Sequence, residues 1–325
     1  MSICLRRRDF IAGLGGAAVW PLAARAQQGD RLRRIGVLAL GTETDSLVVR
    51  RIYEELQKLG WIEGRNLRLD HRFAPSDLDR LRAEAAELVR LAPDVVFAAG
   101  GAAFAAVQQE TRKIPIVFLS GDVADAGMVK NIARPEGNAT GFAAGFSSLG
   151  GKWLELLKEA APNVTRVAFF VLRGGRPGLN STVASVEVAA GALLVQLFTI
   201  PVSDVAEMRA AIESFAAEPN GGLILGRGLP LELQREFPRS AEQYRLPSIS
   251  APPSDRALMS YSIDNAELLR KAVAYVDRIL RGANVSDLPV QYPTRFRLVI
   301  NLKTAKAIGV EIPPTLLALA DEVIE

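Results

Sequence analysis

Short apolar segments alternate with amphipathic segments of helical length along most of the chain, and this alternation starts again near the middle. The first array runs from the apolar segment 35–40 to the extended segment 139–146, and the second from 165–172 to 296–300. Apolar strands separated by helices predict parallel sheets that are covered by helices. Two arrays of similar size in a chain of 325 residues predict an α/β protein with two Rossmann-like, doubly wound lobes.

The loops that follow the strands are the candidates for a binding site. Sheets of this kind bind ligands beyond the carboxyl ends of their strands, where loops and helix N-termini converge. Two lobes that face each other place these loops in a cleft.

The first 26 residues have the order of an export signal: a basic stretch, an apolar stretch and a small-residue cleavage site. Arg7-Arg8-Asp9-Phe10-Ile11 fits the twin-arginine pattern, and the apolar stretch that follows is too short to span a bilayer. An amphipathic or buried N-terminal helix is the alternative, which the three glycines within residues 11–16 disfavour. We expect cleavage after Ala26 and a periplasmic mature protein.

The segment 1–26 also carries the charge imbalance and the only cysteine of the chain. It holds four of the 39 basic residues and one of the 36 acidic residues, so the rest of the chain is electrically neutral. A neutral chain without a Lys/Arg-rich run offers no electrostatic surface to nucleic acid. Because Cys4 lies in the signal, the mature chain has no thiol for a disulfide or a thiolate metal site.

Motifs for catalysis are missing from the sequence. His71 is the only histidine, and it lies in an expected strand with no cysteine as a partner. One imidazole forms neither a zinc site nor an obvious triad, and no P-loop, nucleophile elbow or paired-carboxylate motif occurs. We therefore expect a protein that is not an enzyme and that carries no cofactor or metal.

Seven phrases, in the same order along the chain, carry a resemblance to a known family. They are RIGVL (34–38), LQKLGWIEGRN (56–66), APDVV (92–96), NATGF (138–142), KWLELLK (152–158), YSID (261–264) and LVINLKTAKA (298–307). Together they resemble the ABC transporter substrate-binding family that includes tryptophan/tyrosine-type periplasmic binding proteins.

The resemblance implies a type I periplasmic-binding fold, in which three crossovers join the two lobes and each lobe is discontinuous. The crossovers are expected near residues 142–147, 259–264 and 289–293. The implied domains are the signal 1–26, a first lobe of 27–145 plus 260–288, and a second lobe of 146–259 plus 289–325.

The implied function is solute capture for an ABC uptake transporter. The protein is expected to be a monomer whose lobes close by a hinge on a small organic solute, amino-acid-like or carboxylate-bearing, and present it to a permease in the inner membrane. Two alternatives use the same scaffold: a ligand-sensing partner of a receptor kinase, and a periplasmic enzyme. A sugar-responsive repressor is disfavoured, because a helix-turn-helix segment is missing and an export signal stands in its place.

Three loops of the first lobe supply candidate ligand contacts. Thr42, Thr44 and Ser46 follow the first strand, where they bind a polar group of the ligand or simply cap the next helix. Gly101 and Ala102 follow the third strand, where backbone N–H groups at a helix start suit a carboxylate and a tight turn is the alternative.

The loop after the fourth strand matches the family's aspartate-containing loop. Its candidate contacts are Ser120, Asp122 and Val123. Asp122 is placed to receive a ligand ammonium group by a charge-assisted hydrogen bond, and an Asx-turn is the alternative.

The second lobe and the crossovers supply the other candidates. Arg173, with Arg176 in the same loop, and Arg227 follow strands and suit an anion, because a guanidinium binds a carboxylate through two parallel hydrogen bonds. The candidates at the expected crossovers are Phe146, Tyr261 and Asp264. An aromatic ring there stacks on a ligand or packs the hinge, and hinge packing is favoured for Phe146.

Overall fold

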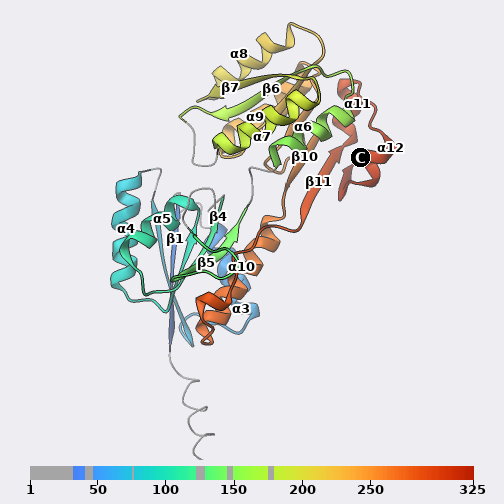
Figure 1. The fold of residues 1–325 in the computed structure, drawn as a ribbon. Coiled ribbons are helices and arrows are strands. Elements are labelled where there is room, and N and C mark those ends of the chain that lie inside the picture. The colour runs from blue at the N-terminus through green and yellow to red at the C-terminus, as the bar shows by residue number, and fades with distance from the viewer. Residues whose placement is uncertain (1–31, 41–46, 75–76, 122–128, 145–148, 175–178) are drawn as a thin grey trace, which may run out of the picture.

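Two α/β lobes make up the protein, each built around its own sheet (Figure 1). The computed structural model describes residues 32–40, 47–74, 77–121, 129–144, 149–174 and 179–325. This architecture confirms the expected fold class of two Rossmann-like lobes with parallel sheets.

The first lobe contains a five-stranded sheet in the order β2-β1-β3-β4-β5, with every neighbouring pair parallel. Its strands are β1 (Arg33–Leu40), β2 (Leu67–Ala74), β3 (Val95–Ala99), β4 (Ile116–Ser120) and β5 (Ala139–Ala143). Its helices are α3 (Leu47–Lys58), α4 (Leu78–Arg90), α5 (Gly101–Glu110) and α10 (Asn265–Leu280), with the short helix η4 (Val285–Asp287). Helices α4 and α5 pack together on one face, while α3 and α10 pack together on the other.

The second lobe contains a seven-stranded sheet in the order β12-β11-β10-β9-β8-β6-β7. Its strands are β6 (Arg166–Leu172), β7 (Gln196–Val202), β8 (Gly221–Leu225), β9 (Ser248–Ser250), β10 (Met259–Ile263), β11 (Phe296–Asn301) and β12 (Glu322–Ile324). Its helices are α6 (Leu149–Ala160), α7 (Leu179–Ala192), α8 (Val205–Ala216), α9 (Leu231–Gln243), α11 (Leu302–Ile308) and α12 (Pro314–Ala318). Every neighbouring pair is parallel except β10–β11, which is antiparallel.

Alternate side chains of the second sheet face two separate apolar cores. Phe170 of β6 packs with Met208 of α8 and Phe237 of α9, whereas Phe169 packs with Trp153 of α6 on the opposite face. This alternation follows from the two-residue period of a strand. A strand that is buried on both sides must be apolar throughout, which explains why the segment 166–172 is recognisable in the sequence.

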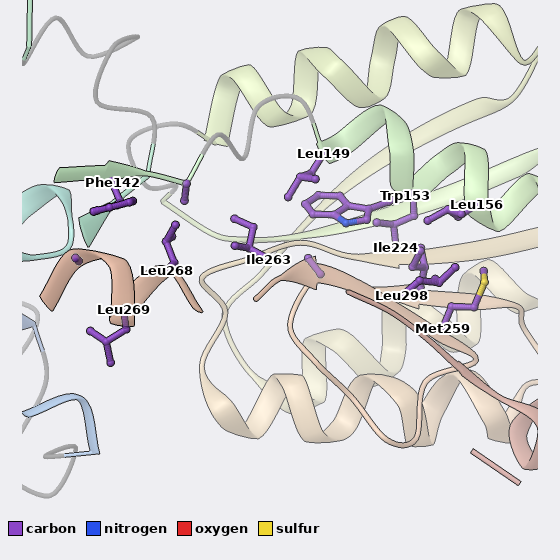
Figure 2. Close-up of a cluster of buried hydrophobic side chains, with 14 of the residues drawn as sticks. Phe142, Leu149, Trp153, Leu156, Ile224, Met259, Ile263, Leu268, Leu269 and Leu298 are labelled. Atoms are coloured by element: carbon purple, nitrogen blue, oxygen red, sulfur yellow. The ribbon is translucent and has the colours of Figure 1, made fainter. Parts of the chain in front are cut away.

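The chain passes between the lobes three times: between β5 and α6, between β10 and α10, and before β11. The last passage is anchored on the first sheet. Gln291 donates its backbone N–H to the Gly141 carbonyl at 3.0 Å and accepts a hydrogen bond from the Ala143 N–H at 2.9 Å. Figure 2 shows the apolar cluster that runs from Phe142 and Leu268 on the first-lobe side to Trp153 in the second lobe.

The sheets divide the chain at slightly different residues from those expected. Residues 260–263 were assigned to the first lobe, but they pair with β9 and β11 of the second sheet. Residues 289–291 were assigned to the second lobe, but Val290 and Gln291 donate hydrogen bonds to Ile132 and Gly141 of the first. Both differences arise because each crossover begins only after the strand or loop before it has completed its pairing.

The structure past residue 301 was not anticipated as regular elements. Asn301 ends β11 and caps α11, since its side-chain oxygen accepts the Thr304 N–H at 2.9 Å. The chain then forms α12 and the short strand β12, which pairs with β11. Among the described residues, no helix is both long enough and apolar enough to cross a membrane.

Gly141 offers a test of how tightly β5 packs on β4. Its φ is 152°, and a Cβ atom there would lie 2.0 Å from the Phe118 carbonyl oxygen. We expect Gly141→Ala to lower the free energy of unfolding by about 3 kcal/mol or more, measured by urea denaturation. Gly191→Ala is the matched control, because a Cβ meets nothing within 4 Å there and should stabilise α7 by about 0.5–1 kcal/mol. Equal effects of the two substitutions would contradict the close approach of the strands.

Candidate ligand-binding site

The carboxyl ends of the central strands in both sheets point toward the opposite lobe (Figure 1). In the first lobe these are the ends of β1, β3 and β4, and in the second lobe the ends of β6, β8 and β9. Loops and helix N-termini from both lobes therefore gather between them, as expected for sheets of this kind.

The loops after β3 and β4 lie against each other in the first lobe. Gly100 has φ 106° and ψ 155°, a conformation that glycine adopts readily, and its N–H donates to the Leu119 carbonyl at 2.8 Å. A Cβ atom on Gly101 would lie 3.0 Å from the Ser120 hydroxyl oxygen. The structure thus brings Gly101, Ala102 and Ser120 together at the start of α5, where the first backbone N–H groups of the helix have no partner within it.

Six of the expected contacts lie outside the described residues. They are Thr42, Thr44, Ser46, Asp122, Val123 and Phe146, and Arg176, the further cation expected after β6, lies outside the described residues as well. All six occur in segments next to the carboxyl ends of β1, β4 or β5.

Among the described residues, Arg227 is a cation that directly follows a central strand of the second sheet. It follows β8 through Gly226, whose backbone is held close to β6: its N–H donates to the Phe170 carbonyl at 3.0 Å, and a Cβ there would lie 2.9 Å from that oxygen. Averaged over all its atoms, Arg227 is half-buried, but its guanidinium group lies among protein atoms and is largely withdrawn from water. The resulting desolvation lowers the pKa of Arg227 to about 10. The group remains protonated at neutral pH in surroundings that disfavour its charge.

Arg173 is occupied elsewhere in the second lobe. Its guanidinium donates to the Ser203 hydroxyl at 3.0 Å, the Pro201 carbonyl at 3.1 Å and the Glu207 carboxylate at 3.0 Å. The pKa of Glu207 is lowered first by the backbone N–H of Ser203 and then by Arg173. Arg173 therefore fastens the end of β7 to the start of α8, and its guanidinium is engaged within the second lobe.

Tyr261 and Asp264 take part in the hinge. The Tyr261 ring stacks on Phe296 with 5.7 Å between centroids, and its carbonyl accepts the Trp153 indole N–H at 2.9 Å. Burial raises the pKa of the Tyr261 hydroxyl. Asp264 caps α10, because one side-chain oxygen accepts the N–H groups of Ala266 and Glu267. These contacts orient the crossover and leave the Asp264 carboxylate engaged with the helix.

Three exposed apolar side chains at the facing ends were not anticipated. Leu40 ends β1, Leu231 begins α9 directly after the Arg227 loop, and Tyr292 lies on the third crossover. Each is more than a third exposed. An apolar residue at a strand end or helix start is visible in the sequence, and this signal would have identified Leu40 and Leu231 as candidate contacts.

The arrangement now has a counterpart among known proteins. The family described as "ABC transporter substrate binding protein" matches residues 35–324, which is nearly the whole of the chain after the signal-like segment. The chain belongs to this family. The expected resemblance is thereby confirmed, and the protein is a substrate-binding protein of an ABC transporter.

Individual relatives of this substrate-binding protein agree with that placement. A tyrosine-binding protein of Clostridioides difficile is 25% identical over 266 residues, covering 79% of this chain and 74% of the relative. A conserved domain protein of Vibrio cholerae has the same fold with a TM-score of 0.76, at 24% identity over 90% of this chain and 100% of that one. An ABC domain of Streptococcus pneumoniae in complex with L-Trp has a TM-score of 0.74, at 21% identity over 90% and 99% of the two chains.

The described part of the substrate-binding protein contains no group of three or more His, Cys, Asp or Glu side chains that could hold a metal ion. His71, on β2, has Phe73 as its ring neighbour at 5.6 Å. Among the described residues, the groups at the facing strand ends are the Arg227 guanidinium, the Ser120 hydroxyl, the backbone N–H groups at the start of α5 and exposed apolar side chains.

The Trp153 indole tests the link between α6 and the hinge. We expect Trp153→Phe to lower the free energy of unfolding by about 1–2 kcal/mol, because a buried carbonyl loses a hydrogen bond, and also to change solute affinity. Trp61→Phe is the control, since its indole N–H donates to Asp277 at 2.8 Å away from β10. Denaturation measures the loss of stability in each variant. Calorimetry measures whether solute affinity changes in Trp153→Phe and stays unchanged in Trp61→Phe. The same solute affinity in both variants would refute a role of Trp153 in the hinge.

Proposed function

We propose that this substrate-binding protein is exported to the periplasm, holds an amino-acid-like or carboxylate-bearing solute between its lobes, and presents it to an ABC permease in the inner membrane. The chain's membership in the ABC transporter substrate-binding family supports the general role of solute binding for transport. The choice of solute is argued from the side chains at the facing strand ends.

The placement of Arg227 carries the proposal. A guanidinium that is withdrawn from water loses hydration free energy, and the lowered pKa of about 10 reflects that loss. An anionic ligand offsets the loss, because a carboxylate accepts two parallel hydrogen bonds from the planar guanidinium. The second lobe therefore favours a solute with a carboxylate.

The first lobe would complete the binding of that solute. The N-terminus of α5 is favourable for a negative charge, and the Ser120 hydroxyl beside Gly101 supplies a further polar contact. A solute that contacts α5 and Arg227 at once interacts with both lobes. Such contacts stabilise the closed arrangement relative to the open one, which is how a ligand shifts a hinge equilibrium.

An apolar part of the solute is supported by three exposed side chains: Leu40 at the end of β1, Leu231 close to Arg227 in the chain, and Tyr292 on the third crossover. The names of two relatives refer to tyrosine and to L-Trp, amino acids with aromatic side chains. We propose that this chain takes a solute of the same kind. Asp122 is the proposed partner of its ammonium group, with Thr42, Thr44, Ser46, Val123 and Phe146 as further contacts.

We infer that the protein works as a monomer without enzymatic activity, and that its lobes comprise 27–145 with 260–288 and 146–259 with 289–325, apart from the strand and loop ends noted above. The relatives are binding proteins, which supports the inference. Turnover of a bound solute, followed by mass spectrometry, would argue for an enzyme on this scaffold.

Arg227 is tested by substitution. Arg227→Gln should weaken the binding of L-tyrosine or L-tryptophan 10- to 100-fold, because hydrogen bonds to a charged group contribute about 1.5–3 kcal/mol. Isothermal titration calorimetry measures the loss. The free energy of unfolding should change by no more than about 1 kcal/mol, since a desolvated charge is removed together with its hydrogen bonds.

Arg173→Gln is the matched control, because the Arg173 guanidinium is already engaged by Glu207 and Ser203. Its affinity for the solute should equal that of the wild type. If Arg227→Gln binds as tightly as the wild type, or if both variants lose affinity alike, the guanidinium of Arg227 does not select the solute. Silence of the wild type toward a broad library of amino and organic acids would reject the proposed solute class.

The proposed export route predicts a dependence on Arg7 and Arg8. Replacing both with lysine should retain the precursor in the cytoplasm, because the twin-arginine pair is read by its receptor. Arg6→Lys, outside the pair, should leave export unchanged. Cell fractionation measures export, and N-terminal analysis of the mature chain should find Gln27 first. Equal export of the double variant would reject the twin-arginine route.

A further inference from the structure

A surface cavity of about 580 Å³ opens at the end of the first lobe that points away from the second lobe. Three segments line it: 112–115 before β4, 131–138 before β5, and 283–286 after α10. These segments lie at the amino ends of the strands, whereas the solute site lies at their carboxyl ends. Figure 1 shows α10 running from the crossover toward this far end. The cavity is therefore separate from the solute site.

Positive charge dominates the lining of this cavity. Arg112, Lys113 and Arg134 are all exposed and contribute to it, and Glu136 is the one acidic residue of the lining. Within the described chain, none of these three cations forms an ion pair. Other arginines of the same lobe are paired, as in Arg34 with Asp70 at 2.6 Å.

The rim of the cavity is held by hydrogen bonds that leave these cations unoccupied. The Asn138 side-chain amide donates to the Thr111 and Ile114 carbonyls at 3.2 and 2.7 Å, which ties the segment before β5 to the segment before β4. The Thr111 hydroxyl accepts the Lys113 N–H at 3.2 Å, and Asn131 accepts the Arg134 N–H at 3.0 Å. The backbone N–H groups of Lys113 and Arg134 are thus held by the protein itself, and the two segments that carry the three cations are tied together.

We propose that this cavity binds a small di- or trianion that carries carboxylate or phosphate groups. Two guanidiniums provide planar pairs of donors, and an ammonium adds a third charge. The side chains of Asn284 and Ser286 add polar atoms for the rest of the ligand. A volume of 580 Å³ exceeds the space of a single simple ion and falls within the usual range of small-molecule pockets.

The test uses the mature protein, with citrate and pyrophosphate as probes in calorimetry at low ionic strength. We expect one-to-one binding that weakens as salt is added, because exposed charges are screened. The triple variant Arg112→Gln, Lys113→Gln, Arg134→Gln should bind at least 10-fold more weakly. Preference for citrate or for pyrophosphate would support the site and tell which anionic group it takes.

A second triple variant controls for net charge. Arg235→Gln, Lys303→Gln and Lys306→Gln remove the same charge from exposed positions of the second lobe and should leave binding of the probes unchanged. The single variant Arg134→Gln, expected to lose about threefold, serves if the first triple variant does not fold. The proposal is overturned if the wild type binds neither probe, if the cavity variants bind like the wild type, or if the control loses as much. Unchanged binding of tyrosine or tryptophan by the triple variant would separate this cavity from the solute site.

Discussion

The pairing of β10 with β11 is the constraint on which the two-lobed arrangement depends. These strands are antiparallel neighbours in the second sheet, yet the helix between them, α10, belongs to the first lobe. The chain therefore leaves the second lobe and returns to it at adjacent points. Contacts such as the Asp264 N–H to the Arg295 carbonyl at 3.4 Å hold the two passages together. Two adjacent passages plus a third after β5 restrict the lobes to a hinge-like relative motion.

Arg173 and Arg227, two arginines of the second lobe, show how residues of one type acquire different environments from their places in the fold. Arg173 and Arg227 both follow strands of the same sheet. Arg173 is exposed and meets an acidic partner on α8, so its charge is used within the lobe. Arg227 is withdrawn from water behind Gly226, and burial disfavours its charge. Burial, rather than residue type, distinguishes the two guanidiniums, and it is the desolvation of Arg227 that supports its proposed role as the receptor for an anion.

Local signals in the sequence predicted most of the fold, because strands such as β1, β3 and β6 are rich in apolar residues and a helix follows each of them along the chain. The apolar segment 165–172, for example, became β6 (Arg166–Leu172). Non-local pairing left no such signal: the antiparallel β10–β11 pair and the terminal strand β12 depend on partners far away in sequence. The same limit applied to the site. The sequence placed Arg173 and Arg227 on an equal footing, because Glu207 lies 34 residues beyond Arg173.

The position of α10 also bears on how the chain acquires its structure. This helix covers the face of the first sheet that carries Phe142, through buried residues such as Leu269 and Tyr275. A ribosome delivers it only after most of the second lobe has been made. Until then α3 packs on that face without its neighbour, and part of the apolar surface stays uncovered. We therefore expect the first lobe to complete its folding only after α10 has been made, and the proposed export of an already folded chain would keep that incomplete surface out of the periplasm.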